Sequence, residues 1–67
     1  MINYEYFQYW QETTEEITLL GDLIKENIER YQRTQDIQYI EYILENIREI
    51  IRLIPLRKEY YDKCFNA

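Results

Sequence analysis

The chain has 67 residues, of which 8 are Lys or Arg and 13 are Asp or Glu, which gives a net charge of −5. Histidine is absent and Cys64 is the only cysteine, so neither an intramolecular disulfide nor a four-ligand zinc site can form. A core of this size seldom supplies more than about 3–5 kcal/mol, so we expect very good helix packing, self-association or a partner protein to complete it.

The first helix is predicted from about residue 4 to residue 32. Its apolar stripe recurs every three or four positions as far as Ile24 and resumes seven residues later: Tyr6, Trp10, Thr13, Ile17, Leu20, Ile24 and Tyr31. Asn3 is a suitable N-cap for this helix. Thr13 and Glu16 also match a capping box, which would divide the segment into two helices near Thr13. Because the stripe stays in phase across Thr13, one continuous helix is favoured over two.

The second helix is predicted from about residue 35 to residue 53. An aliphatic stripe with the same spacing is expected to pack against the first helix: Ile37, Ile40, Leu44, Ile47, Ile51 and Ile54. Thr34 or Asp36 can cap its start. Pro55 disfavours helical geometry at the preceding residue, so the helix is expected to end or kink there.

A short third helix is predicted from about residue 55 to residue 65, with proline in its first position. A short connection near residues 33–35 makes the first two helices antiparallel. Counting equal lengths back from this turn places Pro55 level with residues 13–14, so the third helix covers the start of the first. The predicted fold class is therefore all-α. It is an antiparallel helical hairpin with a short third C-terminal helix, in a single domain spanning residues 1–67.

Aromatic residues are concentrated where these segments meet, and we call this group the aromatic end: Tyr4, Tyr6, Phe7, Tyr9, Trp10, Tyr60, Tyr61 and Phe65. Tyrosine and tryptophan are enriched at binding hot spots, although the cluster could equally be the core beneath the third helix. The candidate partner-binding residues combine exposed aromatics with neighbouring acids: Tyr4, Glu5, Tyr9, Trp10, Glu12, Glu15, Glu16, Tyr60 and Tyr61. Further acids continue along the first helix (Asp22, Glu26 and Glu29). This acidic stripe could mimic DNA phosphates, or it could be only a solvated face.

The second helix is apolar over more of its circumference than one neighbouring helix requires. The residues that broaden it are the candidate dimer interface: Tyr39, Tyr42, Ile43, Ile50 and Leu53. An exposed apolar area of this kind marks an interface. We therefore expect a homodimer that forms a helical bundle.

The sequence contains no groups arranged for catalysis. It offers no nucleophile with an adjacent base and no glycine-rich phosphate loop, so we expect neither an enzyme nor a cofactor. Glu12, Glu15 and Glu16 diverge on a helix face, so no metal site is expected. No segment has the length of a membrane span, and a free thiol without an export signal favours the cytoplasm.

These observations predict a small non-enzymatic regulator that binds another protein. Its size is typical of inhibitors or antagonists from phages, mobile elements and bacterial regulatory circuits. One alternative is a nucleic-acid-binding homodimeric bundle that uses Arg48, Arg52, Arg57 and Lys58. The net negative charge and the interspersed acids disfavour this alternative. A structural assembly module is the remaining alternative.

Overall fold

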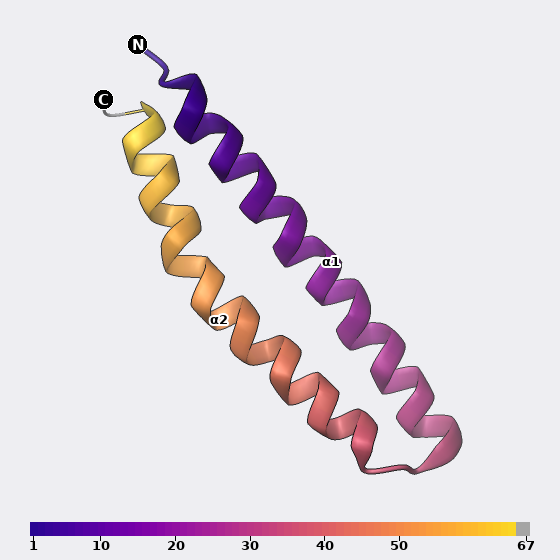
Figure 1. Cartoon of the computed structure of the whole chain (residues 1–67). Helices are drawn as coiled ribbons and strands as arrows, with labels where there is room; N and C mark the ends of the chain where they lie inside the picture. The colour runs from indigo at the N-terminus through magenta and orange to yellow at the C-terminus, as the bar shows by residue number, and fades with distance from the viewer. Residues whose placement is uncertain (66–67) are drawn as a thin grey trace.

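The computed structural model describes residues 1–65 and consists of two helices, α1 (Tyr4–Thr34) and α2 (Gln38–Phe65). They pack antiparallel as a hairpin 51 Å long, with both termini at one end and the turn at the other (Figure 1). Residues 1–65 contain no strand, which confirms the prediction of an all-α hairpin. Over the same residues, neither helix combines the length and the apolar character needed to cross a membrane.

The first helix begins and continues as the sequence predicts. The Asn3 side chain accepts a hydrogen bond from the backbone N–H of Glu5, as an N-cap does. The helix is continuous across Thr13, as the unchanged phase of the apolar stripe predicts, and both threonines at this point bond their hydroxyls within the helix. Thr13 Oγ1 donates to the carbonyl of Tyr9, and Thr14 Oγ1 donates to that of Trp10.

The turn lies two residues later than predicted. Gln35 adopts a left-handed conformation with φ of 57°, and its N–H donates to the carbonyl of Tyr31, which ends α1. The Asp36 side chain then accepts from the backbone N–H of Gln38, so Asp36 caps α2. The same Asp36 donates its own N–H to the hydroxyl of Thr34. Both candidate caps are thus used, and together they make a turn of three residues.

The predicted boundary at Pro55 is absent, since α2 runs through it to Phe65 and no separate third helix forms. Proline removes one helical hydrogen bond and crowds the preceding turn, so a kink is the expected cost. Figure 1 shows that α2 changes direction along its length and that its last turns lean towards α1. Pro55 is exposed, on the side of α2 away from α1. The bend therefore keeps the C-terminal turns against α1 without interrupting the contact between the helices.

Two matching stripes, which we call the seam, join the helices. All residues of the seam are buried or half-buried. The seam residues of α1 are Tyr6, Trp10, Thr13, Ile17, Leu20, Ile24, Asn27 and Tyr31. The seam residues of α2 are Tyr39, Ile43, Asn46, Ile50, Leu53, Arg57, Tyr60 and Cys64. Both stripes alternate steps of four and three residues, which is the pattern of a coiled coil. The cross-helix contacts join residues about equally distant from the turn along the chain, for example Thr14 with Arg57 and Trp10 with Tyr61. This confirms the stripe predicted for α1.

The stripe predicted to pack α2 against α1 faces elsewhere. We call it the free stripe: Ile37, Ile40, Leu44, Ile47, Ile51 and Ile54 are exposed, except for the half-buried Ile40. The stripe used instead starts one or two residues away and contains Asn46 and Arg57, which makes it less apolar. However, it continues past Pro55 to Tyr60 and Cys64, whereas the free stripe is interrupted by Lys58. The seam stripe of α2 is therefore long enough to contact α1 along its whole length, and this explains why α2 packs against α1 through it and not through the free stripe.

Candidate interaction surfaces

The aromatic end is a network that spans both helices, as the sequence predicts. One part of it gathers around Tyr60, whose ring centroid lies 6.3 Å from that of Tyr6 and 5.5 Å from that of Tyr9. Lys63 adds its ammonium group above the Tyr6 ring, at 5.3 Å from the centroid. Asn3 also donates its backbone N–H to the carbonyl of Cys64, which ties the start of α1 to the end of α2.

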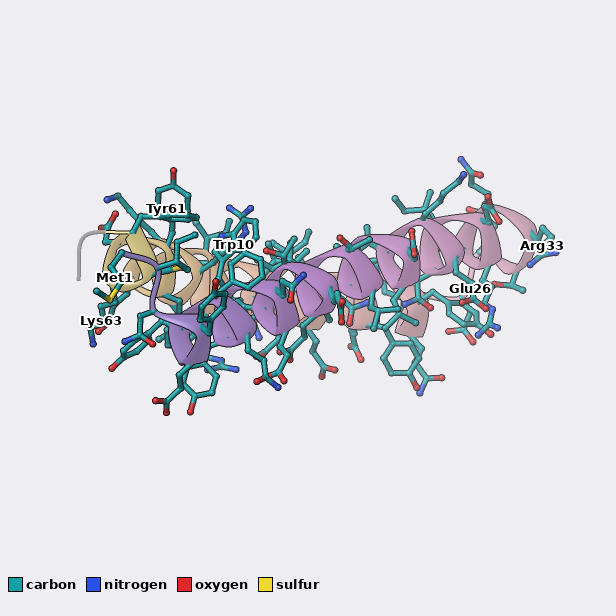
Figure 2. The ribbon with its side chains drawn as sticks, turned by 90° about the horizontal axis from the view of Figure 1, so that it is seen from above. Met1, Trp10, Glu26, Arg33, Tyr61 and Lys63 are labelled. Atoms are coloured by element: carbon teal, nitrogen blue, oxygen red, sulfur yellow. The ribbon has the colours of Figure 1, made fainter. Side chains whose placement is uncertain are left out.

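A second part of the aromatic end lies on the opposite side of the seam and is built around Trp10. The centroid of its indole lies 5.8 Å from that of Phe7 and 6.3 Å from that of Tyr61, which continues to Phe65 at 4.8 Å. Figure 2 shows Tyr61 and Lys63 projecting from opposite edges of the hairpin. The aromatic end therefore presents two sides. One carries Tyr9 and Lys63, and the other carries Tyr61.

Arg57 connects the aromatic end to the rest of the seam. Its Nε donates to the hydroxyl of Thr14 at 2.7 Å, and its guanidinium lies over the Trp10 ring, 5.1 Å from the centroid. The Trp10 Nε1 atom is buried and has no hydrogen-bond partner among residues 1–65, which costs about 1–3 kcal/mol. The cation above the ring offsets part of this cost by about 0.5–2 kcal/mol. Arg57 thus stabilises the fold, a role that sequence reasoning missed.

The candidate partner-binding aromatics differ in accessibility. Tyr4 is 77% exposed and Tyr61 is 48% exposed, so both can contact another molecule. Tyr9 is more modestly exposed, while Trp10 and Tyr60 are half-buried within the network. The two readings of the cluster therefore apply to different members. Trp10 and Tyr60 hold the helices together, and Tyr4 and Tyr61 remain accessible.

By helical spacing, Glu5, Glu12 and Glu16 lie on the side of α1 that carries Tyr9, whereas Glu15 lies on the face opposite the seam. The Tyr9 hydroxyl donates to Glu5 at 2.9 Å, and this hydrogen bond, reinforced by the carboxylate charge, raises the pKa of Tyr9 above its usual value. Glu12 accepts a hydrogen bond from Gln8, while Glu15 and Glu16 are exposed. Further along α1, Glu26 forms an ion pair with Arg30. Glu5 and Glu26 thus have partners within the chain, which weakens the resemblance of the stripe to a phosphate ladder.

Three of the four candidate nucleic-acid contacts are engaged within the chain. Arg52 pairs with Glu49, and this ion pair raises the pKa of the guanidinium and lowers that of the carboxyl group. Lys58 pairs with Asp62, and Arg57 is held by Thr14 and Trp10. Arg48 makes no ion pair or side-chain hydrogen bond within residues 1–65. These residues therefore do not form a concentrated basic patch.

Most of the candidate dimer residues lie in the intramolecular seam. Tyr39, Ile43 and Ile50 are half-buried, and Leu53 is only 4% exposed. Tyr42 alone remains exposed. In the single hairpin, four of these five residues therefore face α1. The exposed apolar surface that the sequence predicts on α2 is present, but the free stripe forms it. The residues expected to be exposed lie in the seam, and the stripe expected to pack against α1 is exposed.

The free stripe borders a shallow depression beside α1. Its lining combines small threonines of α1, Thr14 and Thr18, with Ile54 and the stem of Lys58 from α2. Gly21, one turn further along α1, has open space where a Cβ atom would lie. This side of the hairpin thus carries a depression with a mixed polar and apolar lining next to the free stripe. Residues 1–65 contain no cluster of three or more potential metal ligands.

No protein-family model, curated protein or solved structure matches the chain.

Proposed function

We propose that this chain is a non-enzymatic regulator that binds another protein and acts as its inhibitor or antagonist. The observation that carries the proposal is the exposed apolar surface. Among residues 1–65, only Leu53 and Cys64 are buried apolar residues, while 15 large apolar side chains remain exposed. A hairpin that leaves so much apolar surface in water is suited to binding a macromolecule.

The aromatic end is the part of this surface best suited to a foreign partner. Its inner rings are fixed by contacts across both helices, so its outer rings, Tyr4 and Tyr61, are presented by a rigid base. Rigid aromatic side chains lose little conformational entropy on binding, which is why they recur at hot spots. The acids Glu5 and Glu12 lie on the adjacent side and would steer a partner that carries a basic rim.

A protein is favoured over nucleic acid as the partner. The net charge of −5 repels phosphate, and Arg52, Arg57 and Lys58 are already engaged within the chain. Inhibition by occupancy also needs no chemistry from the chain itself. It requires only that the aromatic end cover a surface that the partner uses.

The proposal is tested by affinity capture with the wild type, a Tyr4→Ala/Tyr61→Ala variant and a matched Tyr42→Ala control. Tyr42 is an exposed tyrosine of α2 outside the aromatic end. We expect the double variant to lose a protein that both the wild type and the control retain. The captured protein should then lose activity when the wild-type chain is added.

Two further measurements decide the chemistry of the contact. Affinity that varies little with salt indicates aromatic contacts, whereas a steep salt dependence indicates the acids. An electrophoretic shift at about physiological salt tests the nucleic-acid alternative. Equal recovery by all three chains, or a shift with DNA or RNA, would contradict the proposed function.

A further inference from the structure

The free stripe has the regular spacing of a second coiled-coil seam. Its six residues follow steps of three, four, three, four and three positions, and all are isoleucine or leucine: Ile37, Ile40, Leu44, Ile47, Ile51 and Ile54. Five of them are exposed; Ile51, for example, is 63% exposed. A stripe of this regularity is suited to pack against one further helix.

The position of the free stripe around α2 determines where that helix would lie. Each residue of the free stripe from Ile40 onwards follows a seam residue by one position, for example Ile51 after Ile50. One residue corresponds to a rotation of about 100° around the helix axis. Seen along the axis of α2, a helix on the free stripe would therefore lie about 100° around α2 from α1. In a four-helix bundle, each helix has two neighbours placed at nearly a right angle around it in this way.

We propose that a second copy of this chain occupies the free stripe, with the two α2 helices antiparallel. The stripe is symmetric about a point midway between Glu45 and Asn46. A two-fold axis at this point places Leu44 against Ile47 of the other copy, with isoleucine pairs on either side. A self-complementary surface is the requirement for a two-fold symmetric dimer.

The charged residues beside the free stripe fit the same axis. Glu41 and Arg48 flank the stripe on its outer side, 4.5 and 2.5 residues from its centre, so the two-fold axis leaves them offset by two residues, about 3 Å along the helix, which their long side chains span. The antiparallel arrangement therefore brings Glu41 of each copy beside Arg48 of the other. Within residues 1–65, both side chains are exposed and neither takes part in an ion pair, so both are free to form this contact.

The first helix also accommodates this axis. The centre of the free stripe lies level with residues 24–25 of α1, since residues in contact across the seam are about equally distant from the turn. The axis then places Ile28, which is exposed, opposite Gly21 of the other copy. In the single hairpin, a Cβ atom at Gly21 would meet nothing within 4 Å. The Ile28 side chain of the other copy would fill this space.

The proposed dimer uses the turn half of each hairpin and leaves the aromatic ends uncovered. The overlap ends near Ile54, whereas the accessible aromatic residues lie beyond it, at Tyr4 and Tyr61. Two aromatic ends would therefore project in opposite directions from one central bundle. The dimer does not depend on partner binding through the aromatic end, because the aromatic end and the free stripe share no residue.

Sedimentation equilibrium over a range of concentrations tests whether a second copy of the chain packs against the free stripe. We expect the wild type to sediment as a dimer, at twice the chain mass of 8.5 kDa. Ile51→Glu should convert it to a helical monomer. Leu19→Glu is the matched control, because Leu19 is also 63% exposed but lies on α1 away from the stripe, and it should leave the dimer intact.

Charge reversal tests the antiparallel register. Glu41→Arg alone and Arg48→Glu alone each create two like-charge contacts and should weaken the homodimer about ten-fold. An equimolar mixture of these two variants restores opposite charges at both contacts, so it should form a heterodimer of wild-type affinity. The Glu41→Arg/Arg48→Glu double variant should likewise recover the homodimer.

A wild-type chain that stays monomeric up to about millimolar concentration, where weak association still registers, would overturn the proposal. A dimer that is insensitive to Ile51→Glu would also overturn it. A dimer sensitive to Ile51→Glu but indifferent to charge reversal would overturn the antiparallel register. None of these results would bear on capture of a partner through Tyr4 and Tyr61, so failures of the two proposals are distinguishable.

Discussion

The two halves of the hairpin are stabilised differently. At the terminal half, aromatic contacts, two cation–π contacts and the Arg57–Thr14 hydrogen bond all join α1 to α2. The turn half has only the seam, and its free stripe lies in water. The ion pairs do not change this contrast, because each joins residues of the same helix. The terminal half is thus complete as a pair of helices, whereas the turn half gains most from a further helix.

The largest expected effect separates the seam from the free stripe. Leu53→Ala removes a side chain that is 4% exposed, and we expect it to lower the free energy of unfolding by about 2–5 kcal/mol. Ile51→Ala, two residues away, should change it by only about 0.5 kcal/mol in the monomer. Urea unfolding in dilute solution measures both values. Equal losses would show that the two stripes do not differ in burial.

The next effect concerns Pro55, which lies where the two halves meet. Pro55→Ala restores a helical hydrogen bond, so the free energy of unfolding should rise by about 1–3 kcal/mol. Thermal unfolding followed by circular dichroism measures the change. A decrease in stability would instead show that the bend is needed to hold Tyr60 and Cys64 against α1.

A smaller gain is expected at Gly21, on the uncovered side of the turn half. In the monomer, measured in dilute solution, Gly21→Ala should raise the free energy of unfolding by about 1 kcal/mol, because alanine is the better helix former and its Cβ meets open space in the single hairpin. The same unfolding experiment measures it. A loss of stability would indicate that another group closely approaches this position.

The smallest effect is at the edge of the terminal half, where Tyr9 donates to Glu5. This hydrogen bond raises the pKa of Tyr9, so its contribution is fully present below the usual tyrosine pKa of about 10 and disappears as the pH rises through the higher folded-state value. Tyrosinate absorbance, compared between the wild type and Tyr9→Phe, isolates this group. The difference should show one tyrosine that titrates above the usual range, and in Glu5→Gln this titration should move back towards it.

The sequence predicted the helices and the register of α1 well because these depend on local periodicity. The stripe keeps a spacing of three and four residues from Tyr6 to Ile24, which predicted the face of α1 that packs against α2; Asn27, the polar seam residue before Tyr31, was not predicted. The cap at Asn3 and the continuity across Thr13 follow from the same local chemistry. The meeting of the aromatic segments also followed, since a hairpin with a short turn must bring its two ends together.

The sequence by itself therefore determined two long amphipathic helices, their antiparallel order and the aromatic end. Only the tertiary structure decided that α2 continues through Pro55 and which of its two stripes faces α1. A local rule forbids a straight helix at proline, but contacts of the following turns with α1 outweigh the lost hydrogen bond. Two apolar stripes one residue apart satisfy periodicity equally well. The stripe that packs against α1 is the one that forms more side-chain contacts along its whole length. These contacts join residues far apart in the sequence, so they form only when the helices pack.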